Sequence, residues 1–115
     1  MTCRISLTDW NGRKLLLLEG SDFLPQQQSE IRALSKSLSE SSQSPPILID
    51  TSGLGLVGSC CLGALIELAM TCRKLGIPCA VVEARPEILD VFDIVSLQSI
   101  LPVFDSLESA GKNGV

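Results

Sequence analysis

The residues best placed for chemistry stand at the start of a predicted helix that runs from Ser59 to Leu75. Serine is favoured at this position because its side-chain oxygen accepts a hydrogen bond from an otherwise unpaired amide. The helix dipole would also favour nucleotide or phosphate contacts there. Cys60 follows directly, and because a helix start lowers the pKa of a thiol, a redox role is one interpretation of Cys60. A small exposed residue without a role is the other.

This helix has one wide apolar face when it is drawn at about 100° per residue. Ser59, Gly63 and Met70 are spaced by four and seven, so they lie along one edge of the polar side. A hydroxyl, a glycine and a methionine on one edge would suit a docking surface, although a serine cap beside an exposed methionine explains the same pattern. The apolar face comprises Cys61, Leu65, Leu68, Ala69, Cys72 and Leu75, and the polar side comprises Ser59, Cys60, Gly63, Glu67, Met70 and Lys74.

The composition argues against catalysis and against metal binding. The chain of 115 residues contains no histidine, which removes the commonest general base, the commonest metal ligand and the usual partner of a nucleophilic serine or cysteine. Its five cysteines include no C-x-x-C pair, which fits neither a disulfide framework nor a zinc site. We therefore expect no catalytic residues, no metal and no cofactor, in a protein that is not an enzyme.

Charge and hydropathy limit the partners. The formal net charge is −4 and the nine Lys and Arg residues are scattered, so nucleic-acid binding is not expected. The longest uncharged apolar stretch contains several glycines and stops at Glu67, which disfavours direct membrane insertion. With no signal peptide visible at the start of the sequence, we expect a reducing, cytoplasmic setting.

The other segments alternate between strands and helices. The alternation of Cys3, Ile5 and Leu7 with polar residues predicts a half-buried strand, and Asn11-Gly12 predicts a hairpin turn. The order predicts a single α/β domain over residues 1–115, in which an N-terminal β-hairpin joins a mixed sheet of four or five strands and four helices lie mainly on one face. The remaining expected elements are a strand at 15–18, a turn at 19–22, a helix from 25 to about 41, strands at 47–49 and 78–82, a helix at 86–95, a strand at 100–104 and a helix at 105–110.

A glycine pattern, Gly53-x-Gly55-x-x-Gly58, matches the dinucleotide-binding fingerprint after a strand. In that fingerprint the helix opens inside the glycine run, and an acidic residue follows about 20 residues later. Here an extended connection is expected from Thr51 to Gly58, and Glu83 lies 30 residues past Gly53. We therefore reject a dinucleotide site.

Taken together, the order and spacing of several weak motifs resemble the STAS family. Residues 47–54 are similar to its strand and loop, an apolar run usually followed by Asp-Leu-Ser, and residues 57–65 fall where the family has Asp-Ser-x-Gly-Leu and its second helix. The match is completed by residues 73–76 at the end of that helix, 101–110 as the closing strand and helix, and 3–22 as the opening hairpin.

The resemblance implies a regulatory binding protein of the anti-sigma factor antagonist type. Such proteins bind a serine kinase with a histidine-kinase-like ATPase fold that doubles as an anti-sigma factor. That kinase phosphorylates the serine that aligns with Ser59, and a phosphoserine phosphatase reverses the switch. A phosphate on Ser59 would lie at the positive end of the helix dipole, so the fold could carry it. The implied partner-binding residues are Gly58, Ser59, Cys60, Gly63, Glu67 and Met70.

Two residues depart from the family pattern. Gly58 replaces the acidic residue before the serine, and Cys61 replaces the glycine two residues after it. The alternative is therefore a phosphorylation-independent STAS domain that binds a transporter ATPase or a scaffold partner.

Overall fold

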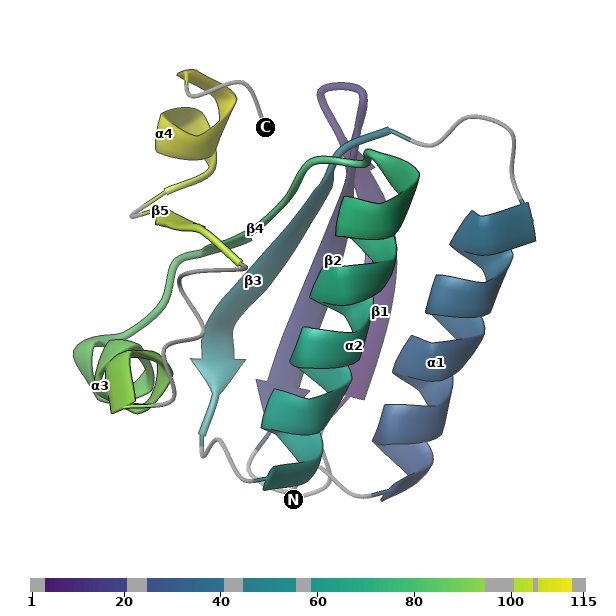
Figure 1. The fold of residues 1–115 in the computed structure, drawn as a ribbon. Coiled ribbons are helices and arrows are strands. Elements are labelled where there is room, and N and C mark those ends of the chain that lie inside the picture. The colour runs from purple at the N-terminus through teal and green to yellow at the C-terminus, as the bar shows by residue number, and fades with distance from the viewer. Residues whose placement is uncertain are drawn as a thin grey trace.

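In this computed structural model, the described residues are 4–20, 25–40, 45–55, 59–94, 101–104 and 106–112, with Ser59 and Cys60 described by their backbone alone. Strands and helices alternate after an opening pair of strands (Figure 1). In chain order they are β1 (Arg4–Trp10), β2 (Arg13–Gly20), α1 (Pro25–Glu40), β3 (Ile47–Leu54), α2 (Ser59–Leu75), β4 (Cys79–Val82), α3 (Pro86–Ile94), β5 (Val103–Phe104) and α4 (Leu107–Lys112).

Within the described residues the strands form a five-stranded mixed sheet in the order β1-β2-β3-β4-β5. β1 and β2 are antiparallel, and every later neighbour pairs in parallel. The turn between β1 and β2 is made by Asn11 and Gly12, whose φ angles are 48° and 77°. Two positive φ angles in a two-residue loop suit the twist of a hairpin, and asparagine and glycine adopt them most readily. The predicted α/β fold with its N-terminal hairpin is confirmed.

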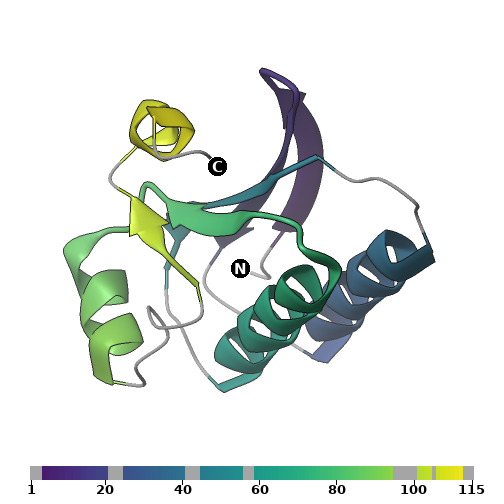
Figure 2. The same cartoon turned by 45° about the horizontal axis from the view of Figure 1, so that its top comes forward.

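The sheet separates two apolar layers. α1, α2 and α3 cover one face, and the short α4 lies on the other (Figure 2). Neighbouring strand residues point to opposite faces, so Leu48 packs beneath α4 while Ile47 and Ile49 face the larger core. All three are at most 1% exposed, as expected for a parallel strand covered on both faces. The prediction of helices mainly on one face is also confirmed.

β3 is longer than the sequence suggested. It continues to Leu54, although an extended connection was expected from Thr51 onward, and β2 likewise includes Glu19 and Gly20, where a turn was expected. Pairing between Glu19 and Gly53 explains the extension, because the two strands stay side by side there. A Cβ atom on Gly53 would lie 2.9 Å from Cγ of Glu19, so any larger residue would force Glu19 or the strands to shift. The first glycine of the rejected fingerprint therefore belongs to the sheet.

Two of the expected buried positions were wrong. Leu75 is 40% exposed, because α2 ends there and Gly76, at φ 73°, turns the chain away. Leu7 is 47% exposed on β1, which lies at the edge of the sheet and has a neighbour on one side only, whereas Ile5 packs against the core. The end of the chain also differs slightly, since α4 begins and ends two residues later than predicted.

Candidate functional site

The chain between β3 and α2 is held at its first residues by hydrogen bonds from neighbouring segments. The guanidinium of Arg85, which precedes α3, donates to the carbonyl oxygens of Leu54 and Gly55, the latter at 3.3 Å. The amide of Gly55 donates to the carbonyl of Gly20 at 2.7 Å. These bonds fix the end of β3, from which the chain leads to the start of α2 at Ser59.

Arg85 reaches this position from a sharp turn after β4. Glu83 has a φ angle of 59°, a left-handed conformation that is unusual for a residue with a side chain and costs about 1–3 kcal/mol. The turn brings the segment after β4 beside the end of β3, which is its parallel neighbour in the sheet. Arg85 was not predicted from the sequence. Its carbonyl partners lie 30 and 31 residues earlier, and no local sequence pattern indicates contacts over that separation.

Ser59 is the first residue of α2, as predicted. Gly58 and the side chains of Ser59 and Cys60 lie outside the described residues. The first turn of α2 contains no acidic residue, so no carboxylate of this turn offsets the positive end of the dipole. Cys61, at the position where the family pattern has glycine, is fully buried and belongs to the core.

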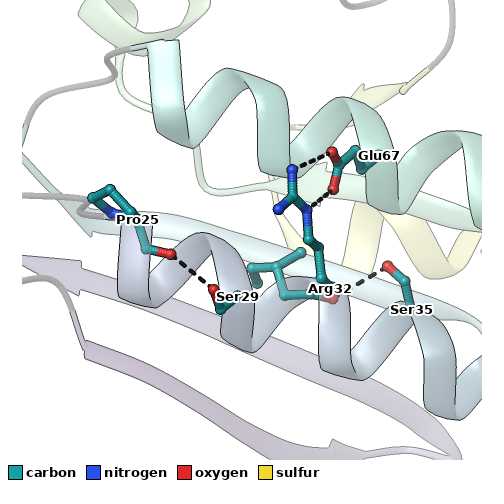
Figure 3. Close-up of polar contacts among 6 residues, drawn as sticks. Pro25, Ser29, Arg32, Ser35 and Glu67 are labelled. Carbon is teal, nitrogen blue, oxygen red and sulfur yellow. Dashed lines mark hydrogen bonds and ion pairs between the residues drawn. The ribbon is translucent and has the colours of Figure 1, made fainter.

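Gly63 and Glu67 lie where α2 packs beside α1. A Cβ atom on Gly63 would be 3.3 Å from Nε2 of Gln28, a tight contact that the end of the Gln28 side chain would have to relieve. Arg32 of α1 donates two hydrogen bonds to the carboxylate of Glu67, from Nε at 2.9 Å and from a terminal guanidinium nitrogen at 3.0 Å (Figure 3). These bonds lower the pKa of Glu67 and raise the pKa of Arg32. The Glu67 side chain is still 42% exposed, so it remains accessible from solvent beside α1.

The open side of α2 carries two exposed apolar side chains. Met70 is 52% exposed and Ile66 is 37% exposed. Residues seven apart on a helix point in nearly the same direction, so Ile66 lies in line with Ser59, and Met70 follows one turn later. We call Ser59, Ile66 and Met70 the α2 stripe. Sequence reasoning missed Ile66, although its spacing of seven from Ser59 could have revealed it.

A shallow groove continues from the stripe toward the end of α2. It has a volume of about 440 Å³ and is lined by Met70, Thr71, Arg73 and Lys74. The two basic residues in the last turn also suit the negative end of the helix dipole. An apolar side chain and two cations therefore lie together at this end of the stripe.

The described residues include no group of three or more His, Cys, Asp and Glu side chains that could hold a metal ion. None of the helices in the described ranges has the length and apolar character needed to cross a membrane.

The sequence is similar to a known domain family and to a curated protein. The sequence profile of the STAS domain matches residues 26–110. Rv2638 of Mycobacterium tuberculosis, a candidate anti-anti-sigma factor by its name, is 27% identical over 108 residues, which are 93% of this chain and 73% of that protein.

Two solved structures share the fold. An anti-sigma factor antagonist from Mycobacterium paratuberculosis superposes with a TM-score of 0.75 at 22% identity, over 96% of this chain and 92% of that one. The Bacillus cell fate determinant SpoIIAA in its phosphorylated form superposes with a TM-score of 0.73 at 14% identity, over 96% of this chain and 99% of that one.

Proposed function

Because the chain belongs to the STAS domain family, we propose that it is a regulatory protein of the anti-sigma factor antagonist type, which binds an anti-sigma factor through the start and open side of α2. The proposed partner is a serine kinase with a histidine-kinase-like ATPase fold, and Ser59 is the residue it phosphorylates. A phosphoserine phosphatase would restore the binding form. We place this function in the cytoplasm.

The observation that carries the proposal is the α2 stripe. Ile66 and Met70 expose apolar surface on the side of α2 opposite its buried residues Leu65 and Leu68, and they stand in line with Ser59. Exposed apolar residues that cluster beside a polar group are typical of protein-binding surfaces. Covering either side chain would contribute about 1–2 kcal/mol to association. A partner seated on the stripe would therefore also contact Ser59.

Phosphorylation would act on the partner more than on the fold. A phosphoserine carries about −1.5 to −2 charges, which the start of a helix favours. The side chain of Arg85 bonds the same connection a few residues before Ser59, and no acidic residue stands in the first turn. The added charge would instead oppose an apolar contact at Ile66 and Met70, because a charge brought into such a contact loses its hydration.

The predicted partner-binding residues divide into three groups under this proposal. Ser59 and Met70, with Ile66 added, form the centre of the contact. Glu67 lies at its rim because Arg32 holds it beside α1, and Gly63 also lies beside α1. Gly58 and Cys60 remain predicted contacts, by their position next to Ser59 in the chain.

We also propose that the protein has no catalytic activity of its own. Histidine is absent from the sequence, and among the described residues the shifted pKa values belong to one exposed ion pair and one pair of thiols. Protein purified free of kinases should turn over neither ATP nor GTP. Turnover that follows the protein through purification and persists at constant specific activity would contradict this.

Affinity capture with matched baits tests the partner. Tagged wild-type protein, Ser59→Asp and Ser39→Asp would each be expressed in the native cell, and the bound proteins identified by mass spectrometry. Ser39 is exposed on α1, so its variant adds the same charge away from the stripe. Wild type and Ser39→Asp should recover an ATP-binding serine kinase that Ser59→Asp loses. Equal recovery of a transporter ATPase or scaffold protein by all three baits would favour the phosphorylation-independent alternative.

A further inference from the structure

The far end of α2, away from Ser59, brings two thiols together. Cys72 lies in the last turn of the helix, and Cys79 is the first residue of β4. Between them Gly76 adopts a φ angle of 73°, and the amide of Ile77 donates to the carbonyl of Cys72 at 2.8 Å. The chain therefore reverses tightly and brings Cys79 back toward Cys72.

Both thiols line one small pocket. Cys72 is 1% exposed, Cys79 is partly buried, and both pack against the main core. The pocket has a volume of about 290 Å³, several times the roughly 30 Å³ that one water occupies in the liquid. A molecule as small as hydrogen peroxide would fit. The other lining residues are Ala69, Arg73, Ile77, Pro78 and Pro102.

The two thiols are chemically unequal. A hydrogen bond from the S–H group of Cys79 lowers the pKa of Cys72, and the same bond, together with burial, raises the pKa of Cys79. The thiolate is the reactive form of cysteine, so Cys72 is the more nucleophilic member of the pair. Cys79 lines the same pocket, which is where a resolving thiol must lie.

We propose that Cys72 and Cys79 form a reversible redox site that a peroxide converts to a disulfide. The Cys72 thiolate attacks one oxygen of hydrogen peroxide, the O–O bond breaks, and the departing hydroxide takes up the proton that Cys72 had lost, giving water and a sulfenic acid on Cys72. The sulfur of Cys79 then attacks the sulfur of Cys72 and the S–O bond breaks. The released hydroxide takes the Cys79 proton and leaves as a second water. Two thiols are oxidised and one peroxide is reduced.

From the sequence, a redox role was one of two interpretations of Cys60, and no resolving thiol was evident for it. For Cys72 the fold supplies a resolving thiol. The tight turn after α2 brings Cys79, seven residues later in the sequence, back to the end of the helix where Cys72 lies. This redox site stands apart from the α2 stripe and does not depend on the proposed partner.

Peptide mapping tests the disulfide directly. The full chain is treated with hydrogen peroxide, remaining thiols are alkylated, and the unfolded protein is digested with trypsin without reductant. Trypsin cleaves after Arg73 and Lys74, which separates Cys72 from Cys79, and the peptide that carries Cys79 contains no other cysteine. We expect the two peptides to stay linked, with the loss of two hydrogens, and dithiothreitol to separate them. Fragmentation of the linked peptide should place the bond at Cys72 rather than at Cys60 or Cys61.

Matched variants locate the reaction. Cys60→Ser and Cys61→Ser should keep the linked peptide, whereas Cys72→Ser should lose it and leave Cys79 alkylated or singly oxidised. Fragmentation of the wild-type peptide decides the site even if a variant at a buried position does not fold. Peroxide treatment that oxidises other cysteines while Cys79 remains free, or that links Cys79 to a cysteine other than Cys72, would overturn the proposal.

Discussion

Both sides of α2 carry large apolar side chains, but those on one side are buried and those on the other are exposed. On the inner side Leu65 and Leu68 are fully buried, whereas on the outer side Ile66 and Met70 are 37% and 52% exposed. Leu65 and Ile66 are similarly apolar neighbours, so their phase on the helix decides which of them is buried. The inner side requires apolar residues of suitable volume, which many sequences supply, and this agrees with a fold shared with SpoIIAA at 14% identity. Under our proposal, the outer side presents the surface that the partner recognises.

The largest expected effect is on stability, and it should differ sharply between Leu65 and its neighbour Ile66. Leu65→Asp would place an unpaired charge among the core residues and should lower the free energy of unfolding by on the order of 3–5 kcal/mol. Ile66→Asp puts the same charge one residue later, on the exposed side, and should change that free energy by less than about 1 kcal/mol. Urea denaturation of both variants measures the difference. Equal stability of the two variants would show that the phase assigned to α2 is wrong.

A smaller effect is expected on binding. Ile66→Ala and Met70→Ala should each weaken affinity for the captured partner by about tenfold, because each removes apolar surface that the complex would cover. Leu75→Ala is the matched control, since Leu75 is 40% exposed on the same helix but points away from the stripe. Isothermal titration gives the three affinities. If Leu75→Ala weakened binding as much as Met70→Ala, the stripe would not be the contact.

The smallest effect concerns pH at the α1–α2 contact. Arg32 lowers the pKa of Glu67, so the stabilisation from this pair is present above the ordinary glutamate pKa and is lost as pH falls through the lowered value. Both side chains are largely exposed, so the effect should be small. Wild type should melt slightly above Glu67→Gln at neutral pH, and the gap should close in acid. Glu30→Gln, on the exposed side of α1, is the control. If the difference in melting temperature between wild type and Glu67→Gln did not change with pH, the Arg32–Glu67 pair would not be its cause.

Local patterns were sufficient to predict most of the fold. Asn11-Gly12 specifies its turn through backbone conformation alone, and the period of α2 placed Leu65 and Leu68 in the core. The same period wrongly placed Leu75 on the buried face, because a helical period does not show where the helix stops covering the sheet. Leu7 was misjudged for a related reason, since alternation along a strand does not reveal that the strand lies at an edge.

The features near the candidate sites were harder to predict because they depend on tertiary contacts. Arg85 bonds carbonyl groups 30 and 31 residues earlier, and Arg32 bonds Glu67 across 35 residues. Cys72 and Cys79 meet only because α2 ends in a tight reversal that leads directly into β4. Ile66 is different, since its spacing of seven from Ser59 was visible in the sequence.

The most direct test of the central claim measures how charge at Ser59 affects partner binding. The captured partner would be titrated with wild type, Ser59→Ala and Ser59→Asp, after circular dichroism has shown that all three are folded. Aspartate is a good residue at a helix start, and alanine loses only about 1 kcal/mol of capping. We expect Ser59→Ala to bind as wild type does and Ser59→Asp to bind roughly two orders of magnitude more weakly, because its carboxylate enters the contact without a counter-charge. Equal affinity of all three proteins would contradict a switch at Ser59.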